Sequence, residues 1–306
     1  MSSGSAGHVA RSPLVPESET SPRTHVRTFL RTADGVSVDV VYEGGATVYD
    51  APGDASAAPS GDLVFVIAHG FTGDLDKPHV RRVAEAFAQY GAVVTFSFRG
   101  HGASGGRSTV GDREVLDLAA AVAWAREFGH ARVATVGFSM GGSVVLRHAA
   151  LYGPRGGAEQ EGRTEARTDA VVSVSAPARW YYRGTAPMRR LHWLVTRPEG
   201  RLVGRYGLRT RIHHRVGAPP TPFRQWGREP VPLSPVEAVP RIAPTPLLIV
   251  HGDRDGYFPV DHPRMLAAAA GDHAELWLEP GMGHAENAAD DDLLHRIGEW
   301  VMTRAG

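Results

Sequence analysis

ARVATVGFSMGGSVVLRHAALY, residues 131–152, joins an apolar strand-like run to a helix-like run through a glycine-flanked serine. Its centre, GFSMG at 137–141, has the form G-x-S-x-G, which presents a nucleophile when a strand precedes it and a helix follows it. Gly137 and Gly141 lack the Cβ atoms that would clash in so tight a turn, and the following helix directs its positive N-terminal dipole toward the serine. A glycine-rich turn with a serine N-cap is the simpler interpretation. The order of strand, turn and helix favours Ser139 as a nucleophile.

Strand-like and helix-like runs alternate outward from this turn. LVFVIA at 63–68 fits a strand buried on both faces, and residues 112–128 fit a helix with Asp112 as its N-cap. The alternation predicts an α/β protein with a mostly parallel central sheet and helices on both faces. Two strand-like runs at 25–32 and 36–42, separated by an Asp-Gly pair, predict an antiparallel hairpin at the sheet edge.

The segment 177–240 breaks the alternation. We expect residues 25–176 and 241–306 to form the α/β core, and 177–240 to be inserted as a cap over the carboxyl ends of the strands, where open α/β sheets bind ligands. Residues 1–24 are rich in Ser, Gly and Pro and are expected to form a disordered leader.

A serine hydroxyl becomes a strong nucleophile only when a base accepts its proton. His284 is the one histidine in the loop after the last expected strand, at 274–279. His273 precedes that strand, and His295 lies on the expected final helix. Although a solvated loop histidine is the alternative, this position predicts His284 as the general base.

The acid that orients the histidine is expected between the serine and the histidine in the chain. Asp253 and Asp255 both follow the strand-like run TPLLIV at 245–250. Asp255 stands beyond the strand end, where it could reach the imidazole, and is the predicted acid. Asp253 is the rival, with capping of the turn as its simpler role.

Stabilisation of a developing oxyanion requires two preorganised hydrogen-bond donors. The N–H of Met140, directly after the serine, is one candidate. The loop HGFTG at 69–73 offers the second, for which Phe71 is the best placed residue. We expect His69 and Gly70 to be structural residues of this loop.

These motifs together resemble the α/β-hydrolase superfamily, particularly its esterases, lipases and acylglycerol-lipase-like members. The matching residues are His69-Gly70, Arg99-Gly100-His101-Gly102-x-Ser104, Gly137-x-Ser139-x-Gly141-Gly142, His251-Gly252-x-x-Asp255 and Gly283-His284. The order serine, acid, histidine is also that of this superfamily. Phe98 departs from the pattern, since the family often has Asp there.

The resemblance implies hydrolysis of a carboxylic ester, or a related acyl bond, through an acyl-serine intermediate. It implies a small-molecule acyl ester as substrate and neither a metal nor an organic cofactor. Thioesterases, haloperoxidase-like enzymes, carbon–carbon bond hydrolases and aminopeptidases share these motifs, and non-catalytic binding proteins share the fold, so the substrate stays open.

The composition excludes other classes of function. Without cysteine the chain has no disulfide, thiolate nucleophile or cysteine-based zinc site. Lys+Arg and Asp+Glu are equal at 33 each, so overall charge gives no argument for nucleic acid. The glycine-rich stretch 98–106 lacks the Lys-Ser/Thr of a P-loop. Apolar runs are too short to span a bilayer and the N-terminus lacks a signal-peptide core, so we expect a cytoplasmic protein without a transmembrane segment.

Charge is uneven within the expected cap. Residues 179–228 hold twelve arginines and a single acidic residue, Glu199, together with seven Trp, Tyr and Phe residues. One hypothesis is that the cap attracts anionic or amphiphilic esters, or an anionic lipid surface. The other is an arginine-rich solvated face, paired with carboxylates of the core. The sequence alone favours the second.

Overall fold

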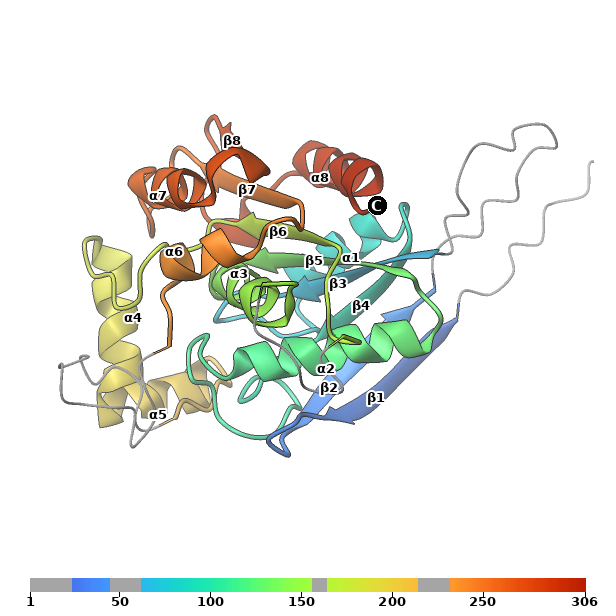
Figure 1. Cartoon of the computed structure of the whole chain (residues 1–306). Coiled ribbons are helices and arrows are strands. Elements are labelled where there is room, and N and C mark those ends of the chain that lie inside the picture. Colours follow the sequence, from blue (N-terminus) through green and yellow to red (C-terminus); the bar gives the residue numbers. More distant parts are fainter. Residues whose placement is uncertain (1–23, 45–61, 156–163, 214–231) are drawn as a thin grey trace, which may run out of the picture.

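A single eight-stranded sheet forms the centre of the protein (Figure 1). The computed structural model describes residues 24–44, 62–155, 164–213 and 232–306. The sheet order is β1-β2-β4-β3-β5-β6-β7-β8. The strands are β1 His25–Arg31, β2 Ser37–Glu43, β3 Leu63–Ala68, β4 Ala92–Phe96, β5 Arg132–Phe138, β6 Ala170–Val174, β7 Leu247–Gly252 and β8 Ala274–Glu279. Pairs from β4 to β8 are parallel, whereas β1–β2 and β2–β4 are antiparallel, which confirms the predicted fold class.

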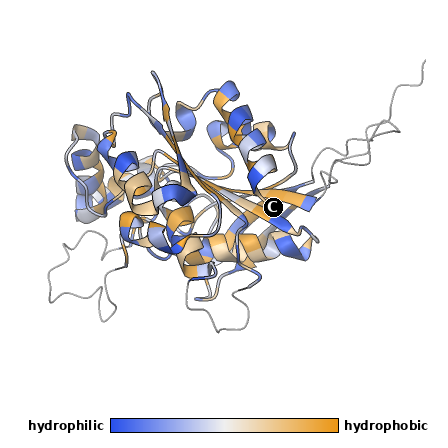
Figure 2. Cartoon of the chain, turned by 45° about the horizontal axis from the view of Figure 1, so that its top comes forward, coloured by the Kyte–Doolittle hydropathy of each residue, from blue (hydrophilic) through white to orange (hydrophobic). Residues whose placement is uncertain are grey.

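Helices cover both faces of the sheet. The helices are α1 Pro78–Phe87, α2 Glu114–Glu127, α3 Met140–Tyr152, α4 Ala186–Thr196, α5 Pro198–Gly207, α6 Pro235–Ala238, α7 Asp261–Ala270 and α8 Asp291–Arg304. Strand β3 shows how the faces are divided. Val64 and Val66 pack with α2, α3 and α7, whereas Phe65 and Ile67 pack with α1 and α8. Figure 2 shows the result, with apolar strands inside and polar residues on the outer sides of the helices.

The hairpin β1–β2 occurs where the Asp-Gly pair predicts it. Its turn places Gly35 at φ +81°, a left-handed conformation that glycine adopts without strain, and the Gly35 N–H donates to the carbonyl of Thr32 at 2.8 Å. The predicted leader, apart from Thr24, lies outside the described residues.

Helix α2 begins later than predicted, at Glu114, and Asp112 is not its N-cap. Val110 and Gly111 have φ values of +57° and +100°, which are incompatible with a helix. The buried Glu114 carboxylate accepts the Thr109 and Gly111 amides at 2.8 and 2.9 Å and so stabilises this turn. Asp112 instead lies 3.3 Å from a guanidinium nitrogen of Arg147.

Two helices, α4 and α5, follow β6 and lie outside the layered core, at the lower left of Figure 1. They belong to the segment expected as a cap, of which residues 214–231 lie outside the described ranges. After α5 in the chain, Ile212 forms an isolated β-bridge with Ser108 of the core, and the Ser108 N–H donates to the Arg211 carbonyl at 2.7 Å. These contacts anchor α5 beside the loop that precedes α2.

Candidate active site

Ser139 occupies a strained turn between β5 and α3. Its φ of +53° is unusual for a residue other than glycine, and its N–H donates to the Val174 carbonyl at 2.8 Å. A Cβ on Gly137 would collide with the Gly141 carbonyl, and a Cβ on Gly141 would collide with the Ala68 carbonyl. Close approach of these backbones is therefore possible only with glycine at both positions.

The structure brings the three residues predicted for catalysis into one chain of hydrogen bonds. His284 Nε2 lies 2.9 Å from Ser139 Oγ, and His284 Nδ1 lies 2.8 Å from Asp255 Oδ2. Because a carboxylate only accepts hydrogen bonds, Nδ1 carries the proton and Nε2 presents its lone pair to the hydroxyl. This arrangement allows proton transfer from the serine to the imidazole.

Asp255 is held as an ionised acceptor. Its side chain is 1% exposed, and Oδ1 accepts the Tyr257 and Phe258 amides at 2.7 and 3.1 Å. Burial alone would raise the pKa of Asp255, but the hydrogen bond and charge of His284, with these amides, hold it below its usual value. Asp253 instead accepts the Gly281 N–H at 2.7 Å.

Two aromatic rings pack against the His284 imidazole. The Tyr257 ring stacks on His284 at a centroid distance of 4.2 Å, and the Phe258 ring meets it edge-on at 5.6 Å. His251 Nε2 donates a hydrogen bond to the Phe258 carbonyl at 2.8 Å. Burial lowers the pKa of His251, so this residue serves as a neutral donor.

The loop after β3 is fixed by two buried histidines. His69 Nδ1 donates to the Gly70 carbonyl at 2.6 Å, and its Nε2 accepts the Phe98 N–H at 3.0 Å. Burial, followed by the nearby His101, lowers the pKa of His69 well below its usual value, so the ring is neutral. His101 Nε2 lies 2.7 Å from the Phe71 carbonyl. The loop therefore has a defined shape where Phe71 follows Gly70.

The Phe71 and Met140 amides have no acceptor within the four described ranges. Met140 is the first residue of α3, so its N–H has no partner within the helix. Gly70 cannot serve in the same way, because its N–H donates to Glu286 Oε1 at 3.1 Å. The pair of unengaged amides could bind an anionic oxygen.

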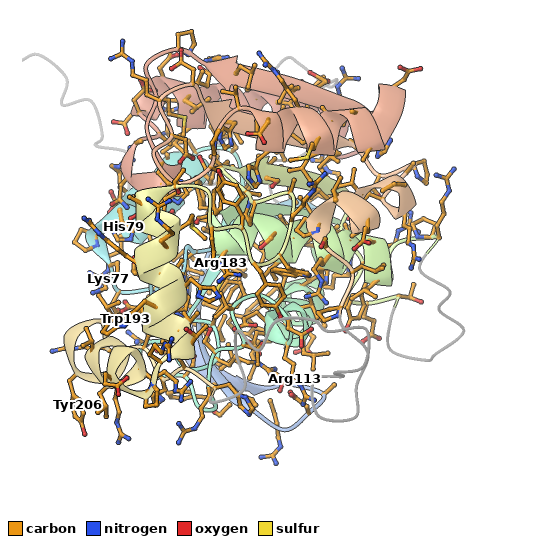
Figure 3. All side chains as sticks on the ribbon, turned by 90° about the vertical axis from the view of Figure 1, so that its left-hand side faces the viewer. Lys77, His79, Arg113, Arg183, Trp193 and Tyr206 are labelled. Atoms are coloured by element: carbon orange, nitrogen blue, oxygen red, sulfur yellow. The ribbon has the colours of Figure 1, made fainter. Side chains whose placement is uncertain are left out.

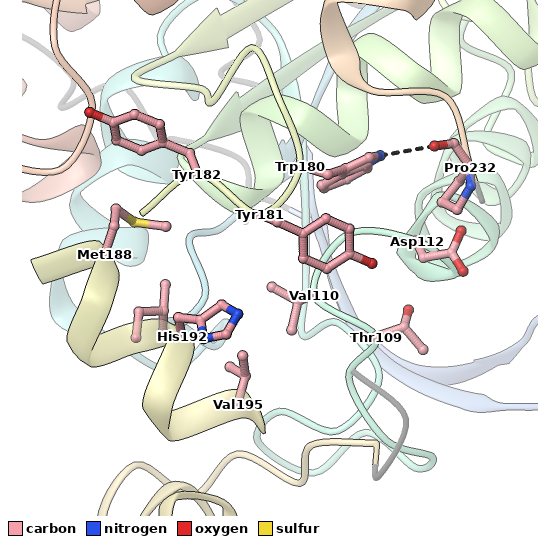
Figure 4. Close-up of a pocket in the computed structure, with 11 residues that line it drawn as sticks. Thr109, Val110, Asp112, Trp180, Tyr181, Tyr182, Met188, His192, Val195 and Pro232 are labelled. Atoms are coloured by element: carbon pink, nitrogen blue, oxygen red, sulfur yellow. Dashed lines mark hydrogen bonds between the residues drawn. The ribbon is translucent and has the colours of Figure 1, made fainter. Parts of the chain in front are cut away.

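An open hollow lies between α4 and the loop before α2 (Figure 4). Its lining is mostly aromatic and aliphatic and comprises Thr109, Val110, Asp112, Trp180, Tyr181, Tyr182, Met188, Leu191, His192, Val195 and Pro232. Trp180 is fixed by a 3.1 Å hydrogen bond from Nε1 to the Pro232 carbonyl and by the Arg147 guanidinium, 5.4 Å from the ring centroid. Val110 and Tyr181 both have positive φ, at +57° and +59°.

None of Ser139, His284 and Asp255 lines this hollow. The connection runs through aromatic side chains: the Tyr182 ring lies 6.1 Å from Phe258, which in turn contacts His284. Gly111, between the lining residues Val110 and Asp112, lies near Ser143 of α3, because a Cβ there would be 3.6 Å from Ser143 Oγ. These contacts link the hollow to the neighbourhood of Ser139 through intervening side chains.

Residues 63–295 match the Alpha/beta hydrolase family. The chain belongs to that family. The matched stretch contains the serine turn, the loops that bear Asp255 and His284, and the loop after β3. No group of three or more metal-binding side chains occurs among the residues that the structure describes, and none of their helices could cross a bilayer.

Two curated relatives of this alpha/beta hydrolase are esterases by name. Esterase LipC of Mycobacterium tuberculosis is 29% identical over 189 residues, which cover 58% of this chain and 42% of LipC. The putative esterase YheT of Escherichia coli is 31% identical over 152 residues, covering 48% of this chain and 39% of YheT. The match thus spans about two fifths of the length of each relative.

Solved structures share the fold of this alpha/beta hydrolase. The esterase Pf2001 of Pyrococcus furiosus superposes with a TM-score of 0.64 at 22% identity, covering 93% of this chain and 94% of Pf2001. Est1E of Butyrivibrio proteoclasticus, in complex with ferulic acid, gives 0.57 at 19% identity, covering 91% and 98%. At these identities the likeness concerns the fold alone.

Several residues near the site were not singled out by sequence reasoning. Tyr257 and Phe258 contact the imidazole. The available signal for them is Asp255, two and three positions earlier, since Asp side chains often accept the backbone amides of residues that closely follow them. Glu286 holds the Gly70 amide from the loop after His284. No pattern in the sequence indicates that residue.

Proposed function

We propose that this alpha/beta hydrolase cleaves a carboxylic ester through an acyl-serine intermediate. The observation that supports it most is the continuous contact Ser139 Oγ–His284 Nε2–Asp255, at 2.9 and 2.8 Å. Esterase names among the curated relatives agree with this reaction. Thioesters and other acyl bonds could react by the same steps, but no contact in the site favours them.

In the proposed reaction, Ser139 Oγ attacks the acyl carbon while His284 Nε2 accepts its proton. Asp255 keeps the imidazole in the required tautomer and stabilises its positive charge. The carbonyl oxygen becomes an oxyanion bound by the Met140 and Phe71 amides. His284 then gives the proton to the leaving alkoxide, and water repeats the sequence to release the acid.

A fluorophosphonate probe tests the nucleophile, because it reacts with an activated serine. We expect the wild type to be labelled and Ser139→Ala to be unlabelled, with ester hydrolysis reduced by at least about 10³-fold. Ser143→Ala is the matched control, since its hydroxyl donates to the Met140 carbonyl at 2.8 Å and takes no part in the proposed reaction. Labelling that survives Ser139→Ala would refute the assignment.

We propose further that the hollow beneath α4 receives the apolar part of the ester. Residues 177–240 would then serve as the cap over the core that the sequence led us to expect. Val195 is buried on α4 and lines the hollow, so Val195→Phe would fill part of it. Each buried methylene contributes about 0.8 kcal/mol, so loss of room for up to four methylenes costs up to about 3 kcal/mol.

The measurement is the ratio of kcat/KM for p-nitrophenyl hexanoate to that for the acetate. In Val195→Phe this ratio should fall by roughly 10- to 150-fold. Trp193→Phe, on the outer side of the same helix, should leave the ratio unchanged. An unchanged ratio in Val195→Phe would show that the acyl chain binds elsewhere.

A further inference from the structure

Helix α5 has its apolar side chains on the solvent side. Leu202, Val203 and Tyr206 are 57%, 51% and 75% exposed. Its buried residues are Gly200 and Gly204, where a Cβ would lie 2.6 Å from the Trp193 carbonyl and 2.9 Å from Ile212. A surface helix of a soluble domain normally buries its apolar stripe and exposes its polar residues. In α5 only glycines are buried, so its larger apolar side chains are exposed to solvent beside Arg205.

Helix α4 continues this surface and also forms a wall of the hollow. Leu191 and Val195 face the hollow. On the other side, Trp193 is 48% exposed between the exposed arginines Arg190 and Arg197. Figure 3 shows Trp193 and Tyr206 along the same edge of the molecule. One helix thus separates the hollow from the exposed apolar side chains.

Positive charge surrounds these side chains. Residues 177–213 contain nine arginines and one acidic residue, Glu199. In the described part of the chain no carboxylate lies within ion-pair distance of five of the arginines, namely Arg183, Arg190, Arg197, Arg205 and Arg209. The interpretation that the sequence favoured, pairing with carboxylates of the core, therefore does not hold for these five.

We propose that the outer face of α4 and α5 binds an anionic phospholipid surface. Arginines would contact the phosphates, while Trp193, Leu202, Val203 and Tyr206 enter the interfacial region, as expected for an amphipathic helix on a bilayer. A second copy of the chain fits less well, since a self-paired contact would bring the same positive charges together. Lipid binding goes beyond the proposed ester hydrolysis and does not depend on it.

Vesicle flotation with the full chain tests the proposal without reference to activity. We expect binding to vesicles of phosphatidylcholine with about one third phosphatidylglycerol, and much weaker binding to pure phosphatidylcholine. Each basic residue near an anionic surface strengthens binding roughly fivefold, so Arg190→Ala/Arg197→Ala should weaken it roughly 25-fold. High salt should weaken binding of the wild type.

Matched variants outside the cap test whether binding depends on this surface or only on overall charge and exposed apolar area. Arg264→Ala/Arg304→Ala removes the same charge from α7 and α8. Trp193→Ala removes an exposed ring from the outer face of α4 and should also weaken binding, and Phe29→Ala, which removes a 56% exposed ring from β1, is its matched control. Both controls should bind within about threefold of the wild type. Thermal unfolding confirms that each variant is folded.

The proposal is overturned if the wild type fails to bind anionic vesicles at low salt, or if cap and control variants lose binding equally. A dimer in solution that Trp193→Ala dissociates, without vesicle binding, would assign the face to a second copy instead. Loss of ester hydrolysis in Ser139→Ala with vesicle binding retained would separate the two proposals.

Discussion

Asp253 and Asp255 stand two positions apart after β7, and their partners distinguish them. Asp255 accepts a hydrogen bond from His284 Nδ1, whereas Asp253 accepts one from the backbone N–H of Gly281. Asp255→Asn would offer an amide in place of the acceptor and favour the wrong imidazole tautomer. We expect kcat to fall by about 10³- to 10⁴-fold, with KM little changed.

Asp253→Asn is the matched control for this substitution. An Asn oxygen can still accept the Gly281 amide, so kcat should stay within about tenfold of the wild type. Steady-state kinetics on p-nitrophenyl acetate measures both variants. A larger loss in Asp253→Asn than in Asp255→Asn would reverse the assignment.

The chain order and the ends of the expected strands were enough to predict which residues meet at Ser139. Residues at the carboxyl ends of parallel strands come together whatever the loops between them do. The left-handed conformations of Val110 and Tyr181 could not be predicted in this way. Neither residue type favours positive φ, and at Val110 the turn is held by the hydrogen bonds that Glu114 accepts from the flanking Thr109 and Gly111 amides.

The junction of β5 and α3 depends on Gly141 more than on helix propensity. Alanine is the better helix former by about 1 kcal/mol, so propensity alone predicts that Gly141→Ala stabilises the protein. The structure predicts the opposite, because the new Cβ would collide with the Ala68 carbonyl. We expect a loss of roughly 2–4 kcal/mol in the free energy of unfolding and a loss of ester hydrolysis.

Gly207, the last residue of α5, is the control for this prediction. A Cβ there has only Val203 near it, at 3.9 Å, so Gly207→Ala should be neutral or slightly stabilising. Urea unfolding of both variants gives the comparison. Equal stability of Gly141→Ala and the wild type would mean that β3 moves away to admit the methyl group.

Helix boundaries show the limit of prediction from sequence for whole elements. Alternation of strands and helices predicted every layer, because burial on two faces imposes that pattern. The start of α2 was predicted two residues early, because Asp112 is a good N-cap by type. Its carboxylate instead lies near Arg147 of α3, a contact between distant segments that local sequence does not encode.

Acid sensitivity of the whole molecule follows from its buried histidines. Five of them are at most 1% exposed, and burial is the first cause that lowers the pKa of each: His69, His101, His148, His251 and His262. For His148 the pKa falls to about 3. The backbone of Ala166 acts to raise this pKa but burial outweighs it, and the ring stacks on Tyr152 at a centroid distance of 4.7 Å. These rings are therefore neutral in the folded protein.

The sign of the effect follows from proton linkage. As the pH falls below the ordinary histidine pKa of 6.5, the unfolded chain binds protons that the folded protein does not accept. The contribution of these histidines to stability is fully present above that pH. It is lost as the pH falls from there through the folded-state pKa values. Each such group contributes up to about 1.4 kcal/mol per pH unit. Five groups should therefore make the free energy of unfolding fall steeply on mild acidification.

We expect this free energy to fall by at least about 2.7 kcal/mol between about pH 6 and pH 5, which corresponds to two or more protons. Urea unfolding across this range measures the slope, and His148→Phe should reduce it by about one proton, or about 1.4 kcal/mol per pH unit. Asp253→Asn should leave it unchanged, because this carboxylate accepts the Gly281 N–H and is not paired with any of these histidines. A slope that corresponds to uptake of less than one proton on unfolding would mean that water enters the core and these histidines are already protonated in the folded state.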